Sequence, residues 1–373
     1  MDSARMTRRR MIQGALALSA AAFAADPLAA YAASESSSAS DADARGAGSS
    51  IRMINYAGWM GATELADFKK ASGTSVSQIV INEDQGRVAK LGADPKAADM
   101  CLGDLTDAGR LAQLGVLGKL DWKKIPNYAK YVRAFGKVDS FSSTKALGIP
   151  TDFGRDGFAY RTDIVKEDLR SWKDLFDVAP KYSGKITLLN IEEDTMSAAL
   201  LALGYSINTT SKSEIMKAGK LLNGIKPHLS ALVSTNMMAP LLNGSGAIAA
   251  DWDYDAGAAV AAHPKLPIKW VDPEDGARAY LDGWVAMKSS SVFPEVEAFM
   301  NFHLEPKNYA KFVNTLGISP ALVPAALPYV KPAIVKSKIL NPPKAVASRI
   351  QFSLAHGASQ QYRDQAWAQF LSS

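Results

Sequence analysis

The stretch IRMINY, residues 51–56, opens an alternation of strand-like and helix-like segments that decides the fold. Residues 62–72 follow with apolar side chains at helical spacing, and Gly73 stands where a left-handed helix cap belongs. Residues 74–81 supply the next strand-like segment. This order at short spacing is typical of a largely parallel sheet covered by helices. We therefore predict an α/β lobe that begins near residue 51.

The same alternation continues far beyond the first lobe. Residues 186–190 and 195–203 form a strand-like and a helix-like pair, and residues 279–287 form a return strand. About 320 residues with this composition more often make two domains than one. Because ligands bind at the carboxyl ends of parallel strands, residues 55–59 and 103–106 are candidate site loops.

A second stretch, AADWDYD at residues 249–255, carries three carboxylates interleaved with two aromatic rings. Carboxylates pair with the charge of a cationic amine, and ring faces hold its methylene and ammonium groups. The stretch is equally compatible with a strand end followed by a helix N-terminus, because Asp is a good helix cap. The residue types alone leave both interpretations open.

The first fifty residues predict export. Three consecutive arginines at residues 8–10 precede an apolar stretch at 11–24, and AYA at 30–32 offers a cleavage site. We predict a twin-arginine signal peptide at residues 1–32, a disordered tether at 33–50 and a periplasmic location. The formal net charge of the whole chain is +5, and removing four arginines and two aspartates with the signal peptide leaves it mildly basic.

The sequence lacks the residues that several classes of function require. No basic run interleaves with aromatic residues, so we expect no nucleic-acid partner. Cys101 is the single cysteine, which excludes an internal disulfide. It lies in an apolar segment far from every histidine in the sequence, so an enzyme that uses this thiol is the less favoured alternative. No zinc spacing or Walker loop occurs, and we predict neither metal nor cofactor. Arg155 and Arg161 leave the binding of an anion as an open alternative.

Short motifs spread over the chain, in this order and spacing, resemble the spermidine/putrescine-binding proteins of ABC importers. The resemblance covers about residues 51–370. It rests on NY at residues 55–56 with Trp59, on SWKDL at 171–175 and on YSGK at 182–185. It rests also on LGYS at 203–206, NTT at 208–210 and Asp282.

The resemblance implies a two-lobed periplasmic-binding-protein fold of type II with discontinuous lobes. Lobe 1 is expected at 51–151 plus 283–320, and lobe 2 at 152–282 plus 321–373. It also implies a monomer that captures a polyamine or related organic cation, performs no chemistry and delivers the ligand to a membrane permease. Another small solute, namely an amino acid-like amine, an organophosphonate or a metal ion, is the alternative ligand.

The resemblance also implies ligand-binding positions. They are Tyr56, Trp59, Asp104, Thr106, Asp194, Asp251, Trp252, Asp253, Tyr254, Tyr280, Asp282 and Gln351. Asp282 matches the amine-pairing carboxylate of the family, and which of Asp251, Asp253 or Asp255 faces the cleft stays open. Two positions depart from the family, because Ile191 stands where a second carboxylate is common and Ile318 where a Tyr is common. These departures bear on which amine is bound.

Overall fold

A computed structural model describes residues 49–82, 84–133 and 148–373. The predicted signal peptide, and the predicted tether up to residue 48, lie outside the described residues.

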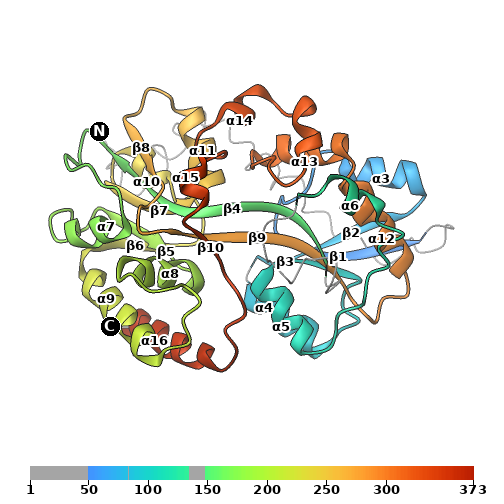
Figure 1. Cartoon of the computed structure of the whole chain (residues 1–373), viewed down its shortest axis with the longest axis horizontal. Coiled ribbons are helices and arrows are strands. Elements are labelled where there is room, and N and C mark those ends of the chain that lie inside the picture. The colour runs from blue at the N-terminus through green and yellow to red at the C-terminus, as the bar shows by residue number, and fades with distance from the viewer. Residues whose placement is uncertain (1–48, 83, 134–147) are drawn as a thin grey trace, which may run out of the picture. The chain divides into compact units, whose positions relative to one another are not determined.

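A sheet of ten strands runs through this part of the chain (Figure 1). The main path has the order β2-β1-β3-β9-β4-β7-β5-β6, while β10 pairs with β9 and β8 pairs with β4. The strands are β1 (Ser50–Asn55), β2 (Ser75–Val80), β3 (Met100–Asp104), β4 (Gly148–Arg161), β5 (Ile186–Leu189), β6 (Leu229–Val233), β7 (Ile248–Trp252), β8 (Ile268–Val271), β9 (Ala277–Ala286) and β10 (Ile350–Phe352).

Two parallel parts of the sheet are joined by the long antiparallel strands β4 and β9. We call the part built on β1, β2 and β3 the first half, and the part built on β5, β6 and β7 the second half. The end of β9 pairs with β3, and the end of β4 pairs with β7. Between these ends β4 and β9 pair with each other from Gly148 to Arg155. Figure 1 shows both strands crossing from one half to the other.

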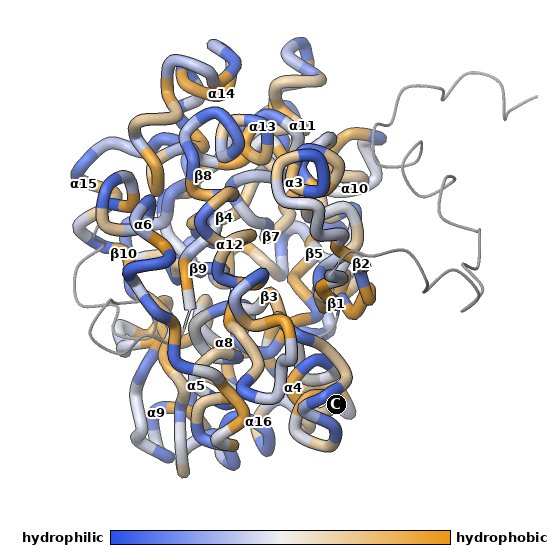
Figure 2. Tube along the Cα trace, turned by 90° about the vertical axis from the view of Figure 1, so that its right-hand side faces the viewer, coloured by the Kyte–Doolittle hydropathy of each residue, from blue (hydrophilic) through white to orange (hydrophobic). Residues whose placement is uncertain are grey.

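Helices cover both halves. They are α3 (Glu64–Ser72), α4 (Asp84–Ala93), α5 (Leu105–Gln113), α6 (Pro126–Tyr131), α7 (Trp172–Val178), α8 (Glu192–Ala202), α9 (Lys212–Ile225), α10 (Ala239–Asn243), α11 (Asp253–Ala262), α12 (Phe293–His303), α13 (Pro306–Leu316), α14 (Pro332–Lys336), α15 (Lys344–Ala347) and α16 (Gln360–Ser372), with the 3-10 turns η2 (Lys226–His228), η3 (Pro324–Tyr329) and η4 (Gly357–Ser359). In Figure 2 the outer helices alternate between hydrophilic and hydrophobic colours, as expected of helices that bury one face. None of the described helices is both long and apolar enough to cross a membrane.

Local sequence signals account for the helix ends. The predicted first helix is α3, and Gly73 caps it with a φ of 77° while its backbone N–H donates to the carbonyl of Lys69. The SWKD motif forms a capping box in which Ser171 and Asp174 each accept a backbone N–H of the other. The predicted return strand is β9, and all ten of its residues are buried.

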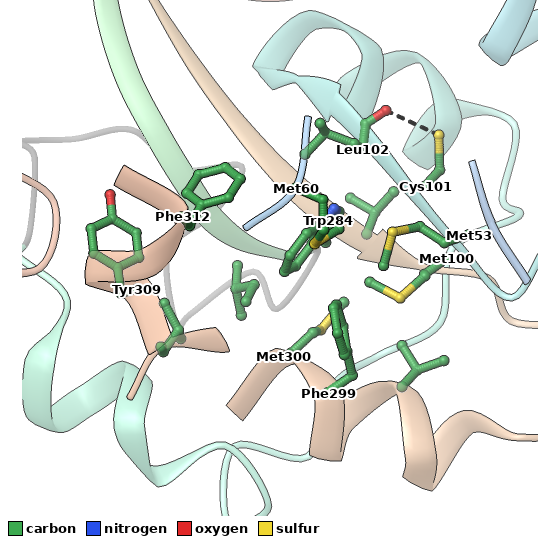
Figure 3. Close-up of a cluster of buried hydrophobic side chains, with 14 of the residues drawn as sticks. Met53, Met60, Met100, Cys101, Leu102, Trp284, Phe299, Met300, Tyr309 and Phe312 are labelled. Atoms are coloured by element: carbon green, nitrogen blue, oxygen red, sulfur yellow. Dashed lines mark hydrogen bonds between the residues drawn. The ribbon is translucent and has the colours of Figure 1, made fainter. Parts of the chain in front are cut away.

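Each half has its own hydrophobic core. The core of the first half contains Trp284 and Phe299 (Figure 3), whose ring centroids lie 5.0 Å apart. The same core extends to Leu340. Cys101 belongs to this core and is 2% exposed, with its Sγ donating to the carbonyl of Leu102 at 3.1 Å. The core of the second half contains Trp172 and extends to Phe370 in α16. The predicted lobe boundaries stay a prediction.

Candidate functional site

Three carboxylates lie in one row across three neighbouring strands where the first half ends. Asp282 of β9 stands opposite Asp104 of β3 on one side and opposite Asp152 of β4 on the other. Directly opposed residues have their Cβ atoms only about 5 Å apart. All three residues are buried, at 7%, 6% and 0% exposure respectively. Such a row costs free energy unless cations or hydrogen-bond donors compensate it.

The two oxygens of the Asp104 carboxylate accept hydrogen bonds from different partners, the N-terminus of α5 and Arg278. Its Oδ1 accepts the backbone N–H groups of Thr106 at 2.8 Å and Asp107 at 3.0 Å, which caps α5, and it also accepts the Thr106 hydroxyl. Its Oδ2 accepts from Arg278 at 3.1 Å. The predicted pair Asp104 and Thr106 therefore anchors the start of α5, and the second carboxylate oxygen of Asp104 is paired with Arg278.

Arg278 is the centre of a buried charge cluster that sequence reasoning missed. It is 5% exposed, and its Nη1 donates to Asp194 at 3.2 Å and to Asp156 at 3.4 Å. Its Nε donates to the Ser353 hydroxyl at 3.0 Å. Its pKa is raised well above the usual value by Asp194, Asp156 and Asp104, in that order, against the effect of burial. An arginine inside the fully buried strand β9 is the sequence signal that could have revealed it, because a buried charge needs a partner.

The cluster around Arg278 contains more acid than one guanidinium neutralises. Asp156 is 2% exposed, and burial raises its pKa well above the ordinary value, with the charge of Asp194 as the next cause. One proton shared by the Asp156 and Asp194 carboxyls would relieve their repulsion. The predicted ligand residue Asp194 thus already has a resident cation.

Aromatic rings from the two halves meet over this region. Trp252 stacks on Tyr254 with ring centroids 5.8 Å apart and an interplanar angle of 9°. Tyr254 makes an edge contact with Trp59 at 5.1 Å, which joins the loop after β1 to the start of α11. The indole N–H of Trp252 donates to Asp194 at 2.8 Å. Three of the predicted aromatic residues are therefore brought together.

Asp253 and Tyr280 form a second, internally paired group. The Tyr280 hydroxyl donates to Asp253 Oδ1 at 3.1 Å, and Arg155 Nη1 donates to Asp253 Oδ2 at 2.7 Å. Burial raises the pKa of Asp253 to about 6, although Arg155 acts to lower it. A Cβ on Gly154 would lie 1.9 Å from the Tyr280 hydroxyl, so only glycine allows this ring to cross β4. Arg155, considered for an anion, is occupied by Asp253 and Asp272.

Asp152 is a buried carboxylate that no cationic side chain of the described residues neutralises. Its Oδ1 accepts from the Trp59 indole at 3.3 Å and from the Thr151 hydroxyl at 2.9 Å. Its Oδ2 is buried and has no hydrogen-bond partner. Burial raises the pKa of Asp152 to about 6. Among the described residues no Lys, Arg or His comes within ion-pair distance of it, although the more distant charge of His303 favours its ionised form.

Asp251 is likewise buried among acids. It is 0% exposed, and its Oδ1 accepts its neighbour's backbone N–H, that of Trp252, at 2.7 Å. Burial raises its pKa well above the ordinary value, and the Asp255 carboxylate is the next cause. Asp255, Asp251, Asp282 and Asp152, in that order after burial, also raise the pKa of the Tyr254 hydroxyl. The acidic stretch at residues 251–255 therefore adds its negative charge to the same region as Asp282.

Two predicted residues have other partners. The Tyr56 hydroxyl accepts from Arg87 at 2.8 Å, and Arg87 also lies over the Tyr56 ring at 4.2 Å from its centroid. Gln351 of β10 accepts from the Ser206 hydroxyl at 2.9 Å and from the backbone N–H of Ile207 at 3.2 Å. Tyr56 still touches the site through its edge contact with the Trp59 ring at 6.1 Å.

The described residues offer no candidate metal centre. They contain no group of three His, Cys, Asp or Glu side chains arranged to hold a metal ion. His303 and His356 each pair with a glutamate, Glu64 and Glu193 respectively. Two surface hollows of about 380 and 290 Å³ lie beside α9 and beside β4, and none of the predicted site residues lines either of them.

Comparisons with known proteins agree with this architecture. Residues 64–342 match the family model of the bacterial extracellular solute-binding proteins. The chain is 25% identical over 311 residues to the putrescine/cadaverine-binding protein of Pseudomonas aeruginosa, which covers 81% of this chain and 87% of that protein. It is also 25% identical over 281 residues to the spermidine/putrescine-binding periplasmic protein of Escherichia coli, covering 74% and 79% of the two chains.

The solved structures agree on the fold. A structure described as a spermidine/putrescine ABC transporter protein of Listeria monocytogenes superimposes with a TM-score of 0.78 at 20% identity, covering 86% of this chain and 98% of that one. The predicted two-lobed fold of type II is thereby confirmed. A family model that spans three quarters of the sequence, together with this fold, assigns the chain to the bacterial extracellular solute-binding proteins.

Proposed function

We propose that this protein captures a polyamine or a related small organic cation in the periplasm and delivers it to the permease of an ABC importer. The observation that carries the proposal is Asp152, a fully buried carboxylate whose Oδ1 accepts from the Trp59 indole N–H and whose Oδ2 has no hydrogen-bond partner among the described residues. A bound ammonium group would supply the missing counter-ion.

The chemistry around Asp152 suits an amine. Asp282 stands opposite Asp152 across the β4–β9 pair, so two carboxyl groups can share one ammonium. Trp59 and Tyr254 meet edge to face beside them and offer ring surfaces to a cation or to methylene groups. An anion would instead have to approach several buried carboxylates, which opposes its binding.

The relatives support the class of ligand. The similar proteins of Pseudomonas aeruginosa and Escherichia coli are named for putrescine, cadaverine and spermidine. The twin-arginine leader that the sequence predicts at residues 1–32 supports export. We infer a monomeric carrier without catalytic activity and without a nucleic-acid partner.

Transport requires a conformational change, and a movement of the two halves relative to each other would provide it. Trp59 belongs to the first half and Tyr254 to the second, and their contact closes the region over Asp152. Among the described strands, β4 and β9 pair with each other across the junction of the two halves, so bending near residues 150–153 and 281–284 would separate the rings. A ligand that binds both halves favours the closed arrangement, and the permease then recognises that arrangement.

Isothermal titration calorimetry of the mature protein tests the proposal. We expect putrescine, cadaverine, spermidine or a simple monoamine to release heat on binding, and Asp152→Asn to weaken that binding by about 10- to 100-fold through loss of a charged hydrogen bond. Asp364→Asn removes a carboxylate from an exposed position of α16 and serves as the matched control. The proposal would be refuted if an anion or a metal ion released heat on binding and no amine did.

A further inference from the structure

We propose that Arg87, a buried residue of α4, is the positioning residue for Trp59: it holds Tyr56 in place, and Tyr56 in turn fixes the Trp59 indole beside Asp152. The inference rests on the proposed function, because the affinity that it concerns is the affinity for an organic cation. It also gives Tyr56 a different role. Tyr56 supports the site from behind, whereas the resemblance implies that it contacts the ligand.

Arg87 joins the segments that follow the three parallel strands β1, β2 and β3. It is 1% exposed, and its Nη1 donates to the carbonyls of Ile81 at 3.0 Å and Asn82 at 3.3 Å, directly after β2. Its Nη2 donates to the hydroxyl of Tyr56, the first residue after β1, at 2.8 Å. It also donates to Asp107 Oδ2, in the first turn of α5 after β3, at 3.0 Å. Because ligands bind at the carboxyl ends of such strands, one guanidinium fixes three site loops relative to each other.

The guanidinium group suits this task better than an ammonium group. It is planar and carries its donors in a rigid fork, so it can bind oxygens of several loops at once. Its Cζ also lies 4.2 Å from the centroid of the Tyr56 ring, where the ring face attracts a cation. The Asp107 carboxylate compensates the buried charge without any ligand. Arg87 thus holds the Tyr56 side chain both at its hydroxyl and at one face.

Tyr56 transmits this position to Trp59. The centroids of the two rings lie 6.1 Å apart at an interplanar angle of 83°. Asn55 holds the backbone of the turn, with its Nδ2 donating to the carbonyl of Trp59 at 2.7 Å. The direction of the indole depends on its ring neighbours, which are Tyr56, Tyr254 and Phe312. Because Tyr254 belongs to the second half, Tyr56 and Phe312 hold the indole when the two halves separate.

A small rotation of the Trp59 indole would change ligand binding. Its Nε1 donates to Asp152 Oδ1 at 3.3 Å, which is longer than is usual for an N–H···O hydrogen bond. A further displacement would break this bond. It would also turn the ring face away from a cation bound at Asp152, and cation–π attraction requires the cation to lie over that face. Arg87 therefore raises the affinity without contacting the ligand.

Titration calorimetry with putrescine, cadaverine, spermidine and n-butylamine tests the inference, using the amine that the wild-type protein binds most tightly. Arg87→Lys keeps a charge for Asp107 but loses the fork, and Tyr56→Phe removes only the hydroxyl that accepts from Arg87. We expect each variant to weaken amine binding by about 3- to 10-fold. Arg52→Lys is the matched control, because Arg52 pairs with the buried Asp99 in the same half, and it should leave the affinity unchanged.

A double-mutant cycle separates positioning from a merely structural role. Trp59→Ala removes the side chain through which Arg87 acts, so in that background Arg87→Lys and Tyr56→Phe should change the affinity by less than about twofold. Effects that add to that of Trp59→Ala would overturn the inference, as would wild-type affinity in both single variants. Urea unfolding shows which variants are folded, and Tyr56→Phe carries the same test if Arg87→Lys does not fold.

Hydrogen exchange of the Trp59 indole N–H gives a readout that needs no ligand. Nuclear magnetic resonance of isotopically labelled protein follows it, and Trp59→Ala assigns the signal. We expect Arg87→Lys and Tyr56→Phe to accelerate this exchange, because the bond to Asp152 loosens, and to leave the exchange of the Trp122 indole unchanged. Unchanged Trp59 exchange in both variants would overturn the inference. If no amine binds the wild-type protein, the proposed function has failed, while this measurement still decides the role of Arg87.

Discussion

Arg278 Nη2 lies 3.1 Å from Asp104 Oδ2, and this ion pair ties β9 to the N-terminus of α5 inside the molecule. The same guanidinium also holds Asp194 at the start of α8 in the second half. One side chain thus links both halves of the sheet through charges that are almost completely removed from water.

The burial of this cluster makes Arg278 important for stability. Arg278→Met leaves Asp104, Asp156 and Asp194 without their shared cation, so we expect the free energy of unfolding to fall by about 3–5 kcal/mol in the absence of ligand. Urea unfolding monitored by circular dichroism measures it. Arg170→Met is the control, because that arginine is 63% exposed and lies 3.9 Å from Glu274, and it should change stability by less than about 1 kcal/mol. Equal losses in both variants would contradict a structural role for the cluster.

The elevated pKa of Asp152 makes its contribution to stability depend on pH. Burial raises this pKa from an ordinary value near 3.8 to about 6 in the folded protein. Between these two values the unfolded chain has lost a proton that the folded protein keeps, so stability falls as pH rises from about 4 to 6 and then levels. Asp152→Asn removes the effect. We expect this variant to gain about 2–3 kcal/mol relative to the wild type between pH 4 and 7.

Unfolding in urea at several pH values measures that difference. Asp364→Asn should show no comparable trend, because its side chain lies at an exposed position. A constant difference between Asp152→Asn and the wild type across this pH range would show that the Asp152 carboxyl is already ionised in the folded protein at pH 4.

The sequence predicted the strands and the acidic site region better than it predicted the charge balance. Hydrophobic runs and helix caps are local signals, so the range of α3 and the course of β9 followed from neighbouring residues. The acids and rings at residues 251–255 were predicted as one site region, and the structure adds that the Trp252 and Tyr254 rings stack on each other.

The partners of these acids depend on strand register, which a single sequence does not contain. In the sequence Asp152 merely begins the predicted lobe 2, yet the pairing of β4 with β9 places it opposite Asp282. Arg278 was overlooked for the same reason, because its acids come from β3, β4 and α8. Gln351 matched the family by position, while its Oε1 binds Ser206 and Ile207.

Gly154 provides a test of the packing beneath the site. A Cβ at this position would lie 1.9 Å from the Tyr280 hydroxyl and 2.5 Å from Asp253 Oδ1. Gly154→Ala should therefore displace Tyr280, break its hydrogen bond to Asp253 and lower the free energy of unfolding by about 1–3 kcal/mol. Gly224→Ala is the matched control, because its Cβ would meet no heavy atom within 4 Å. That variant should be neutral or stabilising in α9. A Gly154→Ala protein of unchanged stability would show that Tyr280 can leave β4 at no cost.

The Trp59–Tyr254 contact provides a test of closure that does not depend on charge. Trp59 donates to Asp152 and packs edge-on against Tyr254, so a ligand at Asp152 is enclosed by residues of both halves. Trp59→Ala should weaken amine binding by about 3- to 30-fold, the range of one cation–π contact. Trp122→Ala removes a tryptophan that instead packs on Tyr128 at 4.5 Å and should leave amine affinity unchanged. Titration calorimetry of both variants with the tightest-binding amine decides the matter, and equal affinities would place the ligand away from the Trp59 ring.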